Sequence, residues 1–346
     1  MPSAVIHSVH RSATAYRAPP WLPGGNLQTL WAALLSRRTE DPPPHWQRER
    51  WSTPDEDFVD IDWLDAPPRG DAEPPLLVLF HGLEGSSASH YAQAFACLAR
   101  HRQWRMAVPH FRGCSGEMNL APRAYHSGDH KEIDWMLERF KARHGGPVMA
   151  VGVSLGGNAL MRWAGEQGTQ ARRRVVAVAS VCAPLDLTAS GQAMGRGFNR
   201  WVYTPMFLKT MVPKALAKLA QHPGLFDRQK LLRARDLGDF DNVFTAPLHG
   251  FGNTETYWRE ASAKPVMPGI ALPALALNAE NDPFIPAWSL PRPEEVSPTV
   301  TLWQPRQGGH VGFPQAEGAW PGTQVLAMPA AVCDFLANAF ERRASR

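Results

Sequence analysis

The sequence predicts an α/β fold with a mostly parallel central sheet, and two observations support this prediction. Short apolar runs with the length of buried strands alternate with longer helix-like runs between residues 76 and 181. Within that stretch, a Gly-x-Ser-x-Gly pentapeptide at residues 152–156 lies between one such strand and one such helix. Strands that alternate with helices favour a parallel sheet covered by helices on both faces.

The expected elements follow one another in a regular order. An early antiparallel strand comes first, because residues 58–64 alternate in polarity. The later strands are apolar throughout, as strands buried on both faces are. In chain order we expect strand 76–80, helix 90–100, strand 105–109, helix 131–143, strand 148–153, helix 157–165, strands 175–181, 272–278 and 299–303, and helix 328–340.

The alternation of strands and helices stops between residues 187 and 264. This stretch contains helix-like segments at 201–212, 214–220 and 227–234 that carry large apolar side chains. Since it lies between two expected strands of the sheet, we expect it to form a helical cap over the end of the sheet. The predicted division is an N-terminal arm at 1–50, a core at 51–186 and 265–346, and a cap insertion at 187–264.

Composition agrees with one globular core plus an insertion. The chain has 346 residues, of which 44% are hydrophobic, and this is enough for a large core. The formal net charge is +4, but the basic residues are scattered. The arginine runs at 172–174 and 342–343 are interpreted as solvated ends of helices. Nucleic-acid binding is therefore not expected.

No cofactor, metal site or membrane span is expected. The four cysteines are widely separated, which indicates neither a disulfide framework nor a zinc site. His126 and His130, on either side of Asp129, have a spacing that could bind a metal on one helical turn, but Gly128 weakens a helix there and no third ligand is evident. No apolar run approaches the roughly 18 residues that span a bilayer, and no signal-peptide pattern is present. The expected location is cytoplasmic.

Ser154 is the candidate nucleophile. A serine at the tip of a strand-to-helix turn is held in a strained backbone conformation that exposes its hydroxyl. Bulky side chains two positions before or after it would collide across the turn. Gly152 and Gly156 remove those collisions.

A serine hydroxyl becomes a good nucleophile when a histidine takes its proton and a carboxylate orients that histidine. In chains with this turn the acid and then the histidine follow the serine. Asp282, in the loop after strand 272–278, is the expected acid, and His310 is the expected base. Glu280 and Asp186 remain alternative acids at this stage.

Two backbone N–H groups should stabilise the negative charge that develops on a substrate oxygen. Leu155, directly after the candidate nucleophile, is expected to supply one of them. Leu83, in the loop after strand 76–80, is expected to supply the other. His81 in the same loop is expected to shape the loop through a hydrogen bond.

Seven sequence blocks, in order along the chain, resemble one known family. They include the Trp-Leu-Pro-Gly-Gly-Asn block near the N-terminus and the turn around Ser154. One departure is Asn26, where relatives often have histidine. The blocks lie at 21–30, 81–87, 111–117, 125–129, 152–158, 281–284 and 308–313, and together they are similar to the α/β-hydrolase superfamily and, within it, its YheT-like branch of esterases.

The resemblance implies the α/β-hydrolase fold and a serine carboxylic ester hydrolase that uses Ser154, Asp282 and His310 through an acyl-enzyme. It implies a small-molecule ester, short- to medium-chain or lipid-like; some eukaryotic relatives are described as phospholipases or as enzymes that make fatty-acid ethyl esters. Two alternatives stay open: an acyltransferase that passes the acyl group to an alcohol, and a non-catalytic binding protein on the same fold. His222 and Asp227 have an acyltransferase-like spacing, although the proline and glycine between them favour a turn.

Overall fold

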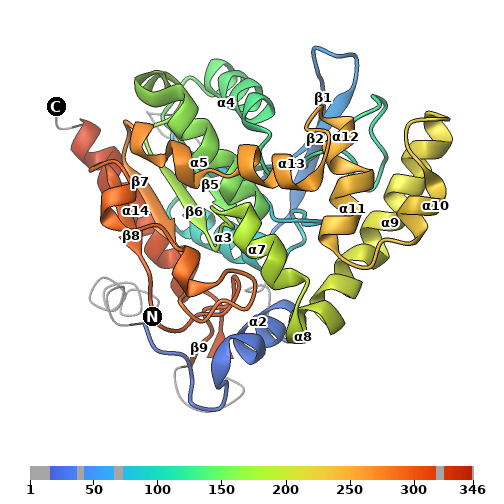
Figure 1. The fold of residues 1–346 in the computed structure, drawn as a ribbon. Helices are drawn as coiled ribbons and strands as arrows, with labels where there is room; N and C mark the ends of the chain where they lie inside the picture. Colours follow the sequence, from blue (N-terminus) through green and yellow to red (C-terminus); the bar gives the residue numbers. More distant parts are fainter. Residues whose placement is uncertain (1–15, 37–42, 66–72, 317–322, 345–346) are drawn as a thin grey trace.

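The computed structural model describes residues 16–36, 43–65, 73–316 and 323–344 (Figure 1). The parts of the predicted arm at 1–15 and 37–42 lie outside the described residues. The core is an eight-stranded sheet in which β1, β2 and β4 pair antiparallel and every later pairing is parallel. The predicted fold class is confirmed. The strand order is β1 (Trp46–Ser52), β2 (Phe58–Leu64), β4 (Arg105–Pro109), β3 (Leu76–Phe80), β5 (Val148–Val153), β6 (Val178–Val181), β7 (Ala274–Leu277) and β8 (Val300–Trp303).

Helices cover both faces of the sheet. Successive side chains of a strand point to opposite faces; in β3, Val78 belongs to the core on one face and Leu79 to the core on the other. Both cores are closed by apolar helix faces, which fixes how the strands and helices pack. The first face carries α4 (His130–His144) and α5 (Leu155–Gln167), and the second carries α3 (His90–His101) and α14 (Ala327–Ala344).

Strand β1 was not predicted from the sequence. It forms the edge of the sheet, and most of its side chains are charged or polar and at least partly exposed; Trp51 alone is buried in it. Charged side chains are typical of edge strands, because they oppose pairing with another chain. Two of them also pair across to β2, Arg48 with Asp62 at 2.7 Å and Arg50 with Asp60 at 2.8 Å.

Seven helices lie between β6 and β7 in the sequence. The two helices expected at 201–212 and 214–220 form one helix, α9, which continues through Pro213. Ala215, two residues further on, is fully buried against neighbouring helices, and this packing offsets the hydrogen bond that the proline removes. The division into arm, core and cap stays a prediction. These helices are α7 (Leu187–Met194), α8 (Gly197–Trp201), α9 (Tyr203–Gln221), α10 (Arg228–Leu232), α11 (Leu237–Val243), α12 (Thr245–Leu248) and α13 (Thr254–Ala261).

Short elements complete the described chain. Helix α2 (Gly24–Leu34) lies beside α8 in Figure 1, far from it in sequence.

Across the described residues, no helix combines the length and the apolar character needed to cross a bilayer. The remaining elements are α6 (Ala171–Arg174), the two-residue pair β9 (Gln315–Ala316) and β10 (Thr323–Gln324), and the 3₁₀ turns Gly168–Gln170, Lys264–Gly269, Ala287–Ser289 and Pro293–Glu295.

Candidate active site

Ser154 lies in the sharp turn between β5 and α5, with a φ of 51°. The two glycines of the motif allow this turn. A Cβ on Gly152 would lie 2.4 Å from the carbonyl oxygen of Gly156, and a Cβ on Gly156 would lie 2.5 Å from the carbonyl oxygens of Phe80 and His81. Since the neighbours are backbone atoms, they cannot move aside, and neither position accepts a larger residue without shifting the turn.

His310 lies between Ser154 and Asp282. Its Nε2 is 3.0 Å from Ser154 Oγ, and its Nδ1 is 2.8 Å from Asp282 Oδ2. Because an ionised carboxylate only accepts hydrogen bonds, Nδ1 carries the proton and the bare Nε2 can accept from the serine hydroxyl. Asp282 also caps its own turn, since its Oδ1 accepts the N–H of Phe284 at 2.8 Å. The three side chains named from the sequence therefore meet.

The two alternative acids lie elsewhere. Asp186 accepts the backbone N–H of Ala189 at 3.0 Å and so caps the start of α7. Glu280 is exposed. Within the described part of the chain, neither residue forms a hydrogen bond with His310.

The loop that carries His310 is held by α2, which the sequence reasoning did not foresee. The backbone N–H of His310 donates to Thr29 Oγ1 at 2.8 Å, and that of Gly308 donates to Gln28 Oε1 at 2.9 Å. Asn281 Nδ2 donates to the same Gln28 oxygen at 3.0 Å, so one buried amide joins the two loops of the site. The only sequence signal was the family resemblance of block 21–30, which assigned it no role.

Cys182 packs behind His310. It follows β6 with a φ of 48°, and its Sγ accepts the N–H of Val311 at 3.2 Å. Burial raises the pKa of this thiol well above its ordinary value, so it remains protonated. Ligand atoms of Cys182, Asp282 and His310 lie within 4.8 Å of one another, which is close enough for a metal. A cation there would have to break the hydrogen bond between Asp282 and His310.

Leu83 and Leu155, the candidate oxyanion donors, line the same cavity as Ser154 and His310. The loop that carries Leu83 is fixed by tyrosine hydroxyls. Its Gly82 N–H donates to Tyr91 at 2.9 Å, and its Glu84 N–H donates to Tyr125 at 3.0 Å. Hydrogen bonds on both sides of Leu83 therefore hold this loop in place.

His81 shapes this loop from inside the protein. It is fully buried, and its Nε2 accepts the N–H of Phe111 at 3.0 Å. The remaining ring nitrogen must then donate, and it contacts the carbonyl oxygen of Gly82 at 2.8 Å. Burial, with a smaller contribution from nearby His110, lowers the pKa of His81 to about 3, so this ring stays neutral.

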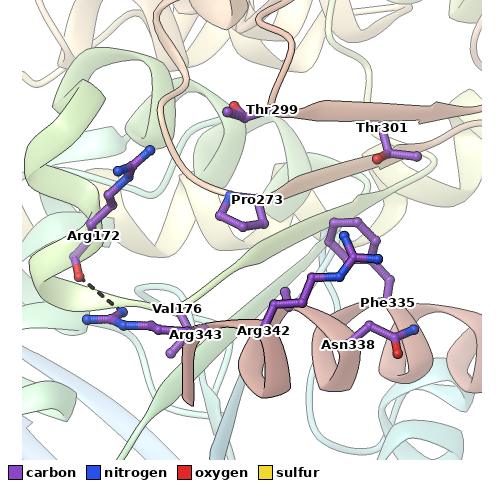
Figure 2. Close-up of a pocket in the computed structure, with 10 residues that line it drawn as sticks. Arg172, Val176, Pro273, Thr299, Thr301, Phe335, Asn338, Arg342 and Arg343 are labelled. Carbon is purple, nitrogen blue, oxygen red and sulfur yellow. Dashed lines mark hydrogen bonds between the residues drawn. The ribbon is translucent and has the colours of Figure 1, made fainter. Parts of the chain in front are cut away.

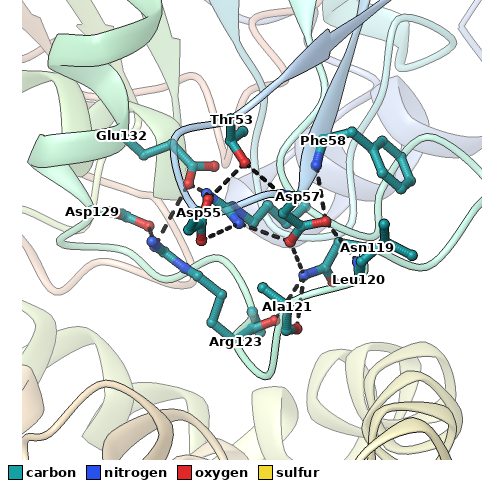
Figure 3. Close-up of polar contacts among 12 residues, drawn as sticks. Thr53, Asp55, Asp57, Phe58, Asn119, Leu120, Ala121, Arg123, Asp129 and Glu132 are labelled. Carbon is teal, nitrogen blue, oxygen red and sulfur yellow. Dashed lines mark hydrogen bonds and ion pairs between the residues drawn. The ribbon is translucent and has the colours of Figure 1, made fainter.

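A buried polar network fastens the segment that leads to Tyr125, since Asn119 Nδ2 and the N–H of Leu120 donate to Asp57 at 2.7 and 2.6 Å (Figure 3). Arg112 donates to Asp57 and Glu132 at 2.7 Å each and to Asp55 at 2.8 Å. These carboxylates come from the turn between β1 and β2 and from α4. The network therefore ties the antiparallel edge of the sheet to the segment that supports the Leu83 loop.

A cavity of about 130 Å³ opens beside Ser154. Much of its wall is apolar and comes from α7, α9 and α13. Asp241 is the acidic residue in this lining; it accepts from Trp258 Nε1 at 2.8 Å, and burial raises its pKa to about 6. Apolar wall residues include Leu187, Met194, Phe207, Trp258 and Phe284.

His222 and Asp227 do not form a second site. The Nε2 of His222 hydrogen-bonds to the carbonyl oxygen of Leu120 at 2.8 Å. Asp227 caps α10 by accepting the N–H groups of Gln229 and Lys230. Both residues serve a helix-to-helix turn, as the intervening proline and glycine indicated.

The fold and the site define a protein of the α/β-hydrolase class. The family described as "alpha/beta hydrolase fold" matches residues 75–317. The chain belongs to this family, and it is a hydrolase enzyme.

Individual relatives make the placement more specific. The chain is 39% identical to "Putative esterase YheT" of Escherichia coli (strain K12), over 83% of this chain and 84% of the relative. It is 28% identical to "Phospholipase ABHD3" of Mus musculus, over 88% of this chain and 74% of the relative. Among solved structures, the Pyrococcus furiosus esterase Pf2001 superposes with a TM-score of 0.52 at 13% identity, covering 86% of this chain and 93% of the esterase. That last likeness concerns the fold alone.

Proposed function

We propose that the protein is a serine carboxylic ester hydrolase in which Ser154, His310 and Asp282 form a catalytic triad. The observation that supports this most directly is the position of His310, hydrogen-bonded to Ser154 Oγ at 3.0 Å and to Asp282 at 2.8 Å. These are hydrogen-bond distances for a nucleophile, a base and the group that orients the base. Similarity to a protein named as an esterase agrees with this chemistry.

In the first half of the reaction, Ser154 Oγ attacks the carbonyl carbon of the ester while His310 Nε2 takes the hydroxyl proton. The carbonyl oxygen becomes an oxyanion, and the N–H groups of Leu83 and Leu155 donate to it. Asp282 stabilises the imidazolium that forms on His310. His310 then gives its proton to the departing alcohol, and the acyl group remains on Ser154.

In the second half, water enters and His310 removes one of its protons. The resulting hydroxide attacks the acyl carbon and forms a second oxyanion at the same donors. When this intermediate collapses, the acid leaves and Ser154 recovers its proton from His310. An alcohol in place of water would make the same acyl-enzyme a donor for acyl transfer.

The cavity beside Ser154 supports an acyl ester as the substrate. Its wall is formed largely by apolar side chains such as Met194, Phe207 and Trp258, which suit an alkyl chain. We therefore propose a short- to medium-chain or lipid-like acyl ester as the substrate class.

Hydrolysis of p-nitrophenyl esters of increasing chain length tests this proposal. Ser154→Ala should lower turnover by at least about 10³-fold and keep the fold, because it removes one small polar atom. Unchanged circular dichroism and an unchanged unfolding midpoint are the control for the fold. A folded Ser154→Ala protein with ordinary turnover would refute the assignment.

Added alcohol in the same assay separates hydrolysis from acyl transfer. A hydrolase should release mainly free acid, and an acyltransferase should release mainly the new ester. Both products should disappear in Ser154→Ala, because both arise from the same acyl-enzyme.

A further inference from the structure

The two arginine runs interpreted from the sequence as separate solvated ends meet in the structure. Arg172 belongs to α6, whereas Arg342 and Arg343 belong to the last turn of α14. Arg343 Nη1 donates to the carbonyl oxygen of Arg172 at 3.4 Å, and all three arginines line one cavity (Figure 2). This contact joins positions 171 residues apart in the chain.

The cavity lies at the opposite edge of the sheet from Ser154. Its lining includes Val176, Pro273 and Thr299, which come directly before or close to the starts of β6, β7 and β8. Ser154, in contrast, follows the end of β5. Because these strands are parallel, their starts and their ends form opposite edges. The cavity is therefore separate from the candidate active site.

The three arginines have no acidic partner among the residues that the structure describes. Arg172 Nε donates to the carbonyl oxygen of Ala271 at 2.6 Å, and no carboxylate of the described chain forms a salt bridge with Arg172, Arg342 or Arg343. Other arginines of the protein are paired with carboxylates, for example Arg162 with Glu166 at 2.8 Å. None of the residues that line the cavity is acidic.

A second, adjoining cavity continues the basic surface. It has a volume of about 370 Å³, shares Arg172, Val176 and Arg343 with the first, and adds Lys141 and further arginines to the lining. Like charges gathered around a concave surface attract anions and raise their local concentration. Arginines in the last turn of a helix interact favourably with the helix dipole. This interaction explains the arginines of α6 and those of α14 separately. That effect explains neither their meeting across one cavity nor the apolar surface between them.

The floor of the first cavity is apolar. Val176 and Pro273 lie between Arg172 and Arg342, Phe335 lies beside the Arg342 side chain, and Thr301 and Asn338 complete the lining (Figure 2). The volume, about 600 Å³, lies within the range of small-molecule sites. Guanidinium groups match the geometry of carboxylate and phosphate oxygens, and an apolar floor accommodates an alkyl chain.

We propose that this cavity binds an anionic amphiphile, a single molecule with a carboxylate or phosphate head and an alkyl tail. The head lies against Arg172, Arg342 and Arg343, and the tail lies on Val176 and Phe335. A concave cavity of about 600 Å³ has room for one molecule, whereas a flat membrane surface would leave its apolar floor uncovered. Binding here is independent of the proposed ester hydrolysis.

Isothermal titration of the full-length protein with decyl phosphate, decanoate and inorganic phosphate tests the proposal. Decyl phosphate should bind at least about tenfold more tightly than inorganic phosphate, since burial of the methylene groups of its tail is favourable. The ratio of decyl phosphate to decanoate then tells which head group the site prefers. Phe207→Ala changes the cavity beside Ser154 and not this one, so it should bind decyl phosphate as the wild type does, which separates this site from the candidate active site.

Two charge-matched double variants identify the site. Arg172→Gln with Arg342→Gln should weaken decyl phosphate binding by at least about tenfold, because charge-assisted hydrogen bonds are lost. Arg228→Gln with Arg259→Gln removes the same charge from exposed positions that line neither of the two cavities, and it should change affinity less than about twofold.

Several results would overturn the proposal. These are an equal loss of affinity in both double variants, equal affinity for decyl phosphate and inorganic phosphate, and no binding of either amphiphile at millimolar concentration. Binding to vesicles of anionic phospholipid without binding of the soluble amphiphiles, lost in the first double variant, would mean a membrane-docking surface instead.

Discussion

Ser154 has a backbone conformation that residues other than glycine rarely adopt, with a φ of 51°. The strand before it and the helix after it hold this conformation, because Gly152 and Gly156 let their backbones approach closely. The result is a hydroxyl that projects toward His310 at 3.0 Å. The strained backbone of Ser154 thus places its hydroxyl group, which would react, beside His310.

Asp282→Asn tests the acid at the scale of single residues. The interaction that it weakens is made to the imidazolium that forms during the reaction, so turnover should fall by about 10⁴-fold with little change in KM. Steady-state kinetics on a p-nitrophenyl ester measure both constants.

Asp186→Asn and Glu280→Gln are the matched controls for this variant. Asp186 caps α7 and Glu280 is exposed, so each substitution should change turnover by less than about tenfold. If Asp186→Asn abolished activity and Asp282→Asn did not, the acid would come from the loop after β6.

Sequence order and spacing predicted the residues that meet at Ser154, because each follows an apolar strand and the ends of parallel strands share one edge. Gln28, Thr29 and Cys182 were not predicted as supports of the His310 loop. Thr29 and His310 are 281 residues apart, and no local pattern encodes such a contact. Only the folded chain reveals it.

At the scale of elements, the buried Arg112 network joins the β1–β2 turn to α4. We therefore expect that loss of Arg112 lowers the stability of the protein strongly. Arg112→Met leaves the carboxylates of Asp57 and Glu132 buried without their partner. Such a loss typically destabilises a protein by about 3–5 kcal/mol. Urea unfolding monitored by tryptophan fluorescence measures the change in the free energy of unfolding.

Arg259→Gln provides the comparison for Arg112→Met. Arg259 pairs with Glu260 on the surface, where both side chains are more than half exposed, so the substitution should change the free energy of unfolding by less than about 1 kcal/mol. Equal unfolding midpoints for the two variants would contradict the role given to the Arg112 network.

Periodicity identified the buried strands but missed β1 and divided α9. A strand at a solvated edge needs no alternation of apolar residues, and β1 pairs through charged side chains such as Arg48 and Arg50. Pro213 looks like a helix end in the sequence, yet packing around Ala215 keeps the helix continuous. In both cases tertiary contacts outweighed the local signal.

At the scale of the whole molecule, the sheet has two chemically different edges. Strand ends carry the Ser154 site, and strand starts carry the arginine-lined cavity. The sequence predicted the first edge through motifs. The second edge was not foreseen, because runs 172–174 and 342–343 are remote in sequence and each is explained locally as a helix end.

The stability of the protein at acidic pH should depend on the carboxyl groups whose pKa is lowered in the folded state. Burial alone would raise the pKa of Asp55, but hydrogen bonds from Arg112 and Thr53 outweigh it and lower the pKa to about 2. The pKa values of Asp57 and Asp62 are lowered in the same manner. Since the pKa of an unfolded aspartate is about 3.9, these groups stabilise the folded state above that pH, and the stabilisation is lost as the pH falls toward 2.

Carboxyl groups with a raised pKa do not change the pH range over which this stabilisation is lost. Glu132, whose pKa burial and nearby Asp129 raise to about 7, is protonated in both the folded and the unfolded state below pH 4. Thermal unfolding at pH 5, 4, 3 and 2.5 should therefore show a midpoint that falls steadily below pH 4. A midpoint that stays constant over this range would contradict the assignment of these ion pairs.

Covalent labelling with a fluorophosphonate, followed by mass spectrometry of the modified peptide, tests the central claim most directly. The probe reacts with a serine only where a base activates the hydroxyl. We predict one labelled residue, Ser154, and loss of labelling in His310→Ala. Labelling at another serine, or undiminished labelling of Ser154 in His310→Ala, would contradict the proposed catalytic triad.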